Sequence, residues 1–137
     1  MSKANQDHGK ATRAAGKPAE RYRIVHLDDI PAVPCPCGMS HRAFADDPDR
    51  AASVHVVDIQ QGSRTHYHKT RTEVYYILEG RGEVELDGTR FAVRPGSFVM
   101  IRPGCRHRAV GQLKIVNVVV PPFDPADEWM DDAKGEG

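Results

Sequence analysis

The stretch THYHKTRTEVYYILEG, residues 65–80, places two histidines and a glutamate ahead of an apolar run. Side chains alternate between the two faces of a β-strand, so His66 and His68 share one face. If residues 69–72 form a turn, Glu73 opens the next strand on the same face as His68 and within its reach. The stretch therefore predicts two neighbouring strand ends whose polar side chains converge.

Two imidazoles and one carboxylate that converge are a suitable ligand set for Fe(II), Mn(II), Zn(II), Ni(II) or Co(II). His107 follows another predicted strand and could complete four protein ligands. We therefore expect one divalent transition metal ion per chain, of open identity, bound by His66, His68, Glu73 and His107. The alternative is a set of ordinary surface histidines beside a solvated glutamate, because the chain holds 7 histidines in 137 residues.

The middle of the chain is rich in β-branched and aromatic residues, and it is divided by Gly, Pro, Asp and Asn at turn positions. The pair Asp87-Gly88 is a strong hairpin signal. No segment from 53 to 120 keeps a helical period over three turns. The pattern predicts an all-β antiparallel sandwich or barrel, with strands over residues 53–59, 73–80, 82–88, 90–96, 97–104 and 113–120.

Composition excludes several classes of protein. A chain of 137 residues and 15.2 kDa is expected to form one domain. A formal net charge of +0 argues against a nucleic-acid surface, and no apolar run is long enough to cross a membrane. Without the apolar core of a signal peptide, the expected location is cytoplasmic. Three cysteines in a reducing compartment make a disulfide framework unlikely.

The chain divides into four expected parts. Residues 1–22 are polar and basic and form a flexible tail, and residues 23–51 form an N-terminal arm. Residues 52–122 make the barrel, and residues 123–137 are an acidic C-terminal segment. Within the arm, Pro-Cys-Pro-Cys-Gly at 34–38 is expected to be an extended strip that lies on the barrel or across a dimer partner; a redox or soft-metal role is the alternative.

Two motifs resemble those of the cupin superfamily. HYHKTRTEVYYILEG matches the first motif, His-x-His, a few residues, Glu, six residues and Gly, at His66, His68, Glu73 and Gly80. PGSFVMIRPGCRH resembles the second, with His107 at its metal-binding histidine. Three positions depart from the pattern without touching the four ligands: the leading Gly of the first motif, Arg102 in place of a Pro, and Gly111 in place of an Asn. The local sequence also resembles small bacterial cupins that are loosely labelled as similar to mannose-6-phosphate isomerase.

The resemblance implies a jelly-roll β-barrel, often dimeric, with the metal ligands inside. It leaves the reaction open. Two functional classes remain: a metal-dependent enzyme acting on a small polar organic substrate, of dioxygenase or isomerase type, and a non-catalytic cupin that binds or senses a small molecule. A scaffold whose metal only stabilises the fold is a third reading. A homodimer is expected, because the apolar face of residues 74–78 needs cover.

Several other side chains are candidates for the pocket. Tyr75 shares a face with Glu73 and is the candidate catalytic proton donor, although a packed barrel residue is the bland alternative. His55 is expected to be a core or rim histidine with its hydrogen bonds satisfied. Asn117 would either support a ligand or bond at a strand end. Arg64 and Arg102, near the ligand loops, could bind a substrate carboxylate or phosphate.

Overall fold

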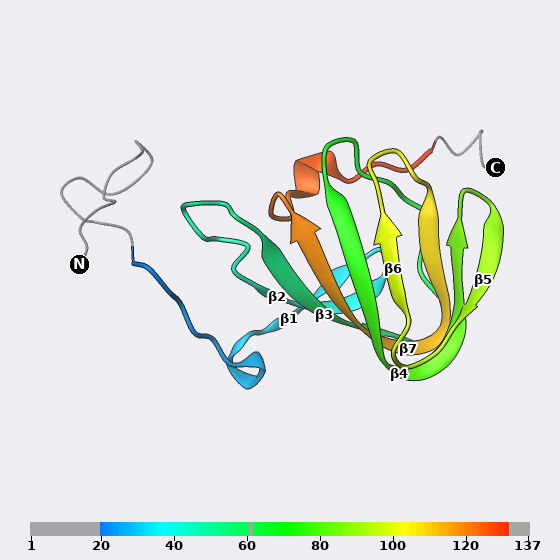
Figure 1. Ribbon diagram of the computed structural model, residues 1–137, viewed down its shortest axis with the longest axis horizontal. Helices are drawn as coiled ribbons and strands as arrows, with labels where there is room; N and C mark the ends of the chain where they lie inside the picture. Colours follow the sequence, from blue (N-terminus) through cyan, green and yellow to red (C-terminus); the bar gives the residue numbers. More distant parts are fainter. Residues whose placement is uncertain (1–19, 61, 132–137) are drawn as a thin grey trace.

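The computed structural model describes residues 20–60 and 62–131, and within them the chain is almost entirely β (Figure 1). The predicted all-β fold is confirmed. Two 3-10 turns flank the strands, η1 (Leu27–Asp29) and η2 (Pro125–Asp127). The strands are β1 (Ala32–Cys35), β2 (Gly38–Ala43), β3 (Ser53–Ile59), β4 (Thr72–Leu86), β5 (Thr89–Val93), β6 (Phe98–Ile101) and β7 (His107–Val120).

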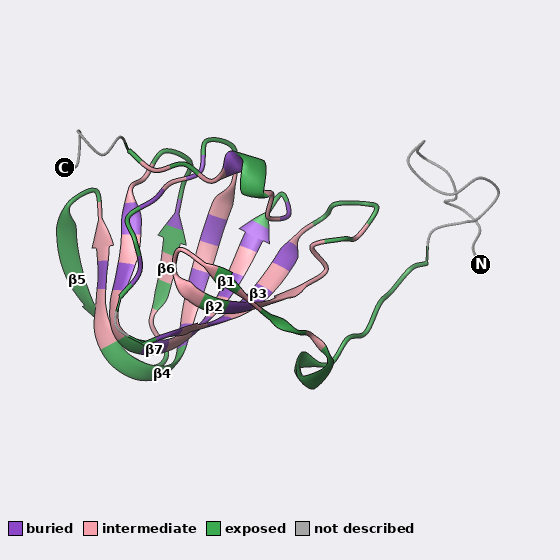
Figure 2. Ribbon diagram, turned by 180° about the vertical axis from the view of Figure 1, so that it is seen from behind, coloured by how far each residue is buried: buried purple, intermediate pink, exposed green. Residues whose placement is uncertain are grey.

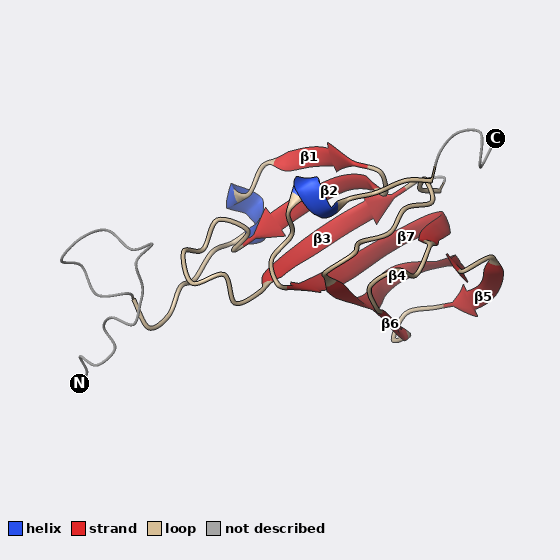
Figure 3. Cartoon of the chain, turned by 90° about the horizontal axis from the view of Figure 1, so that it is seen from above, coloured by secondary structure: helices blue, strands red, loops and turns tan. Residues whose placement is uncertain are grey.

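All pairings are antiparallel, and the order across the sheet is β1-β2-β3-β7-β4-β5, with β6 pairing to β4 as well. Seen from above, the strands follow one another from β1 to β7, with β5 and β6 beyond β4 (Figure 3). The long strands β4 and β7 pair from Thr72↔Val120 to Leu86↔His107. This ladder brings the start of β7, with His107, beside the end of β4.

Burial alternates along the strands, as Figure 2 shows. In β3 every second residue is buried, β7 follows the same pattern over most of its length, and β4 follows it over residues 72–77. Inward-facing aliphatic side chains such as Ile59, Ile77 and Ile115 form the core. Burial of these side chains drives formation of the barrel.

Further along the same inward faces the side chains become polar. His55 of β3 pairs with Asn117 of β7, which pairs on its other side with Tyr75 of β4. Glu73 lies one inward position beyond Tyr75 and is buried. The strands therefore place an apolar core and a polar, buried site in one interior.

The arm differs from its predicted form. Residues 32–43 form the hairpin of β1 and β2, and β2 adds to the sheet by pairing with β3. Cys35 and Cys37 are joined by a disulfide across the hairpin turn, so the expectation that no disulfide forms was wrong, and Cys105 alone is a free thiol in the described part. The bond closes a turn that holds only Pro36 between the two cysteines, a constraint that cysteine counting cannot detect. The predicted tail lies mostly outside the described residues.

The C-terminal segment returns to the site. After η2, Trp129 exchanges two backbone hydrogen bonds of 2.9 Å with Tyr67, between the two histidines of the first motif. The Asp127 carboxylate accepts hydrogen bonds from the backbone N–H groups of Lys69 and Thr70. These contacts place Asp127 and Glu128 against the loop that carries His66 and His68. Neither 3-10 turn is long enough to cross a membrane, and the described residues form no other helix.

Candidate metal centre

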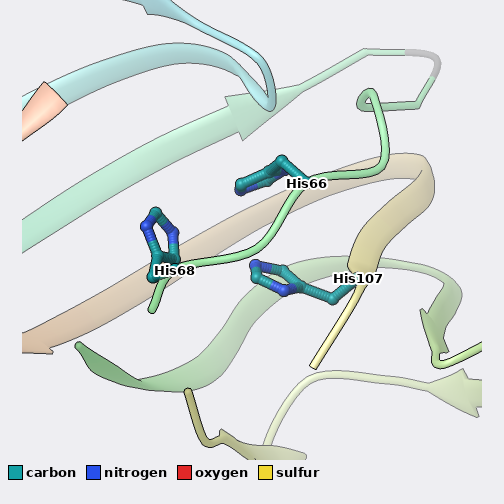
Figure 4. A group of neighbouring side chains, drawn as sticks. All are labelled: His66, His68 and His107. Carbon is teal, nitrogen blue, oxygen red and sulfur yellow. The ribbon is translucent and has the colours of Figure 1, made fainter. Parts of the chain in front are cut away.

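Three buried histidines, His66, His68 and His107, bring one ring nitrogen each to within 4.8 Å of the others. Their rings turn toward a common space in Figure 4. His66 and His107 face each other across a small antiparallel bridge, with backbone N–H to carbonyl distances of 3.1 and 2.9 Å. The carbonyl of His68 accepts a hydrogen bond of 2.8 Å from the Gly104 N–H. The two predicted motifs therefore meet through backbone bonds.

Each histidine is oriented by a backbone carbonyl. Nδ1 lies 2.9 Å from the Arg64 carbonyl in His66, 2.8 Å from the Asp127 carbonyl in His68, and 2.9 Å from the Cys105 carbonyl in His107. Because a carbonyl only accepts hydrogen bonds, Nδ1 carries the proton in all three rings. In the neutral rings Nε2 then offers a lone pair, the form in which histidine binds a metal.

Glu73 lies between two of these rings. Its Oε2 is 3.1 Å from His68 Nε2, and its Oε1 is 3.1 Å from His107 Nε2. Asn117 Nδ2 donates a hydrogen bond of 3.2 Å to Oε2, which is the supporting role weighed for Asn117 in the sequence. Glu73 is the second residue of β4, directly after the loop that carries His68.

The unpartnered atoms fit a cation. His68 Nε2, His107 Nε2 and Glu73 Oε1 are buried and have no hydrogen-bond partner. With the Nδ1 protons committed to carbonyls, lone pairs face one another at 3.1 Å. Each buried polar atom left in this state costs about 1–3 kcal/mol. A divalent ion among nitrogen and oxygen donors removes that cost, so the side chains present suit a bound metal.

The pKa shifts of these side chains show how strongly the groups interact. Burial alone raises the pKa of Glu73, but the His107 and His68 rings outweigh it and hold the pKa well below its usual value. Burial, helped by His107, lowers the pKa of His66 to about 4. Burial also opposes protonation of His68, but Glu73 outweighs it and raises the pKa of that ring. The carboxylate is therefore ionised and His66 neutral near pH 7, the states needed for metal binding, whereas the raised pKa of His68 means that a metal at this ring competes with a proton.

These groups line a small cavity of about 20 Å³, which has room for about one water molecule. Its wall includes three of the four predicted ligands, His66, His68 and Glu73, and Tyr75. Burial raises the pKa of Tyr75 well above its usual value, so this phenol stays protonated near neutral pH and can donate a hydrogen bond.

His55 also lines the cavity, and its Nε2 lies 2.9 Å from the Ser53 hydroxyl. Burial, followed by the charge of Arg42, lowers its pKa to about 4. This is the satisfied interior histidine of the sequence expectation. Arg64 and Arg102 are exposed, and neither is among the residues of the cavity wall. The arginine on the wall is Arg42, from the β1–β2 hairpin.

Sequence reasoning missed two charged groups of the cavity, Arg42 and Glu128. Arg42 lies on β2, but the sequence predicts an N-terminal arm over residues 23–51 and no strand there. Glu128 stands in an acidic run near the C-terminus, where no local pattern separates one carboxylate from the next. Both reach the site through long-range packing, which a motif does not encode.

A comparison with known protein families identifies the family of this chain. A model of the cupin domain matches residues 53–119, from the start of β3 almost to the end of β7. The chain belongs to the cupin superfamily. The predicted resemblance to the cupin superfamily is thereby confirmed, and the barrel is a cupin barrel.

Individual relatives agree with this assignment. This cupin is 42% identical to an uncharacterized protein of Methanocaldococcus jannaschii over 72 residues, 48% of this chain and 58% of that protein. It is 32% identical to L-ectoine synthase of Halomonas elongata over 99 residues, 60% of this chain and 72% of that enzyme. A crystal structure of a protein from Planctomyces limnophilus is 40% identical, with a TM-score of 0.74, over 85% of this chain and 100% of that chain.

Proposed function

We propose that this cupin is a metal-dependent enzyme that transfers protons on a small polar organic substrate, as an isomerase does. The observation that carries the proposal is one cavity wall with two kinds of group: the convergent donors His66, His68 and Glu73, and the carboxyl group of Glu128. A pure binding protein needs the first kind alone. Catalysis of proton transfer needs a group that can gain and lose a proton beside the bound substrate.

The proposed ligands are His66, His68, Glu73 and His107, and the ion they would bind is Fe, Mn, Zn, Ni or Co. When bound, such an ion supplies Lewis acidity to a coordinated substrate oxygen. The chain keeps the donors in position through the carbonyls that fix the three rings. Asn117 holds the Glu73 carboxylate from behind.

Glu128 and Tyr75 have different roles in this proposal. Burial raises the pKa of the Glu128 carboxyl, which brings it closer to neutral pH, where an acid–base catalyst is most effective. Glu128 accepts a proton from the substrate at one carbon or oxygen and returns it at another. Tyr75, a protonated phenol on the same wall, donates a hydrogen bond to a substrate oxygen. Tyr75 is thus the proposed catalytic hydrogen-bond donor and not the base.

An isotope experiment tests the proposal. The metal-loaded protein is incubated in D₂O with small hydroxy, keto and amino compounds, and proton NMR follows exchange of carbon-bound protons. We expect exchange that requires metal, is lost in Glu128→Gln and persists in the exposed control Glu79→Gln. Substrate-dependent oxygen consumption without exchange would identify a dioxygenase. Binding of a compound with neither result would favour the non-catalytic sensing or binding cupin.

The ectoine synthase relative supports an enzyme over a sensor, because at 32% identity the chain covers 72% of that enzyme. Its reaction is not transferred to this chain. The chain covers 58% and 65% of the first two curated relatives, the second being an L-ectoine synthase of Desulfatibacillum aliphaticivorans. The cytoplasmic location likewise stays a prediction.

We also propose that the protein is a homodimer. Large apolar side chains lie on the outer face of the sheet, where Val74 of β4 pairs with Met100 of β6 and Tyr76 pairs with Phe98. Phe98 is 73% exposed and Met100 is 55% exposed. A contiguous apolar face of this kind is typical of an interface between protein chains.

A further inference from the structure

We propose that Arg42 forms a carboxylate-binding subsite beside the metal donors, so that the substrate is a small carboxylic acid. The inference rests on the proposed function in one respect: it takes the cavity of His66, His68 and Glu73 as the substrate site. It adds the chemical class of the substrate and the residue that recognises it.

Arg42 is unusual among the arginines of this chain. Its side chain lines the cavity with the metal donors, and its Nε is buried without any hydrogen-bond partner. Five other arginines of the described part, by contrast, form ion pairs with side-chain carboxylates. A buried guanidinium N–H that bonds to nothing is costly, and an anionic ligand would satisfy it.

The guanidinium is held in place before any ligand arrives. Arg42 lies over the ring of Phe123, with 4.2 Å from Cζ to the ring centroid. The backbone N–H of Phe123 donates a hydrogen bond of 3.0 Å to the Ser53 hydroxyl, which contacts His55. His55 in turn pairs with Arg42 across β2 and β3 and meets the Phe123 ring edge-on at 5.6 Å. This stacked arrangement fixes the plane of the guanidinium, which lowers the entropic cost of binding a planar anion.

Charge and shape select a carboxylate among the possible anions. Glu73 and Glu128 share the cavity wall with Arg42, and two carboxyl groups beside one guanidinium disfavour a doubly charged phosphate. A carboxylate is flat, carries one charge and matches the planar guanidinium fork. The other end of such an acid would reach the metal donors, and Glu128 would face it.

The subsite is tested by calorimetric titration of the cobalt(II)-loaded protein. The probes are lactate, its neutral analogue lactamide, and inorganic phosphate. The variants are Arg42→Met, which removes the charge at similar length, and Arg42→Lys, which keeps the charge without the planar fork. Arg94→Met, an exposed arginine outside the cavity wall, is the control. Circular dichroism and elemental analysis report the fold and the metal content of each protein.

We expect lactate to bind the wild type at least about tenfold more tightly than lactamide or phosphate, since a charge-assisted hydrogen bond has this strength. Arg42→Met should lose about 10- to 100-fold in lactate affinity, Arg42→Lys should be intermediate, and Arg94→Met unchanged. Metal content should stay the same in all of them. Equal lactate affinity in folded Arg42→Met, or no lactate binding by the wild type, would overturn the subsite.

Failure of the metal site gives a different result. If the wild type takes up no cobalt, the proposed function is wrong, and the same titrations are made on the metal-free protein. Lactate binding that still depends on Arg42 would then support the subsite without the metal. Lactate binding that does not change in Arg42→Met would reject the subsite as well. Should Arg42→Met fail to fold, Arg42→Lys decides, because full affinity in that variant would contradict recognition by the planar fork.

Discussion

Backbone carbonyls, not acidic side chains, orient the three histidines of this cupin. Arg64, Asp127 and Cys105 supply the carbonyls, so the donor geometry depends on the path of the chain around the site. The one side-chain support is the amide of Asn117 on Glu73. Because outer contacts of this kind strongly affect metal affinity, substitutions at the ligands and changes in the loops that carry these carbonyls should have comparable effects.

Replacing Glu73 tests whether this residue binds the metal or only lies close to it. Glu73→Gln keeps the shape of the side chain and removes the charge that offsets a divalent ion, so metal content should fall at least about tenfold. The β-fold should survive, because the apolar core does not include this residue. Elemental analysis and far-UV circular dichroism measure the two effects.

Tyr75→Phe is the companion variant for that experiment. The phenol stays protonated in the folded protein and is not one of the proposed ligands, so metal content should not change while turnover or ligand affinity falls. Full metal retention in Glu73→Gln would show that the histidines suffice. Loss of metal in Tyr75→Phe would place the phenol in or next to the coordination sphere.

Asp127 makes the fold sensitive to acid. Burial raises the pKa of its carboxyl, but hydrogen bonds from Lys69 and Thr70 outweigh it and hold the pKa well below the usual value. A depressed pKa stabilises the folded state above the unfolded pKa of about 3.9 and loses that contribution as the pH falls below it. In metal-free protein, Asp127→Asn should lower the free energy of unfolding at pH 7 by about 1–3 kcal/mol. The free energy of unfolding of this variant should also decline less steeply below about pH 4 than that of the wild type. Urea titrations at several pH values measure both effects. An equally steep acid decline in the variant would assign acid sensitivity to other groups.

At the scale of elements, the strands predicted correctly are those in which apolar and polar side chains alternate within the strand's own sequence. The strand at 53–59 has the bounds of β3, and Asp87-Gly88 forms the turn between β4 and β5. The segments 73–80 and 82–88 are one strand, because Gly80, at φ 92°, continues β4 past an irregularity of register instead of ending it. The β1–β2 hairpin was missed because its prolines and Gly38 oppose strand propensity. Pairing of β2 with β3 incorporates the hairpin into the sheet.

The ladder between β4 and β7 requires a glycine at position 82. A Cβ on Gly82 would lie 2.2 Å from the Val110 carbonyl oxygen, whereas one on Gly62, beside the same residue, would have its nearest contact at 3.6 Å. Gly82→Ala should therefore destabilise the protein by at least about 2 kcal/mol, and Gly62→Ala should change stability by less than about 1 kcal/mol. Thermal unfolding of both variants measures the difference. Equal stabilities would mean that the ladder shifts without cost.

At the scale of the whole molecule, the exposed apolar residues on the outer sheet face are the proposed dimer interface. Phe98→Asp places a charge where a 73% exposed apolar side chain stands, so it should convert a dimer of the 15.2 kDa chain into a monomer. Phe91→Asp, on β5 at 51% exposure, is the control and should remain dimeric. Light scattering at micromolar concentration gives the mass. A monomeric wild type would reject the proposed dimer.

The whole molecule also decides how much of the site a sequence can reveal. Spacing found His66, His68 and Glu73, because those residues lie close together in the chain, and the second motif added His107. The predicted strand end before Glu73 is not there: His66 forms an isolated bridge with His107, and His68 lies in the loop before β4. Arg42 and Glu128 enter the same cavity from the hairpin and from the C-terminal segment. Their positions depend on contacts between residues far apart in the chain, such as Tyr67 with Trp129, and no periodicity encodes these.

The metal stoichiometry of the purified protein tests the central claim most directly. The chain is produced without an affinity tag, stripped, reloaded with zinc or cobalt and dialysed, and elemental analysis is compared with that of a variant in which His66, His68 and His107 are all alanine. The account predicts about one ion per wild-type chain and almost none in the variant. A wild type that retains no ion, or a variant that retains as much as the wild type, would contradict it.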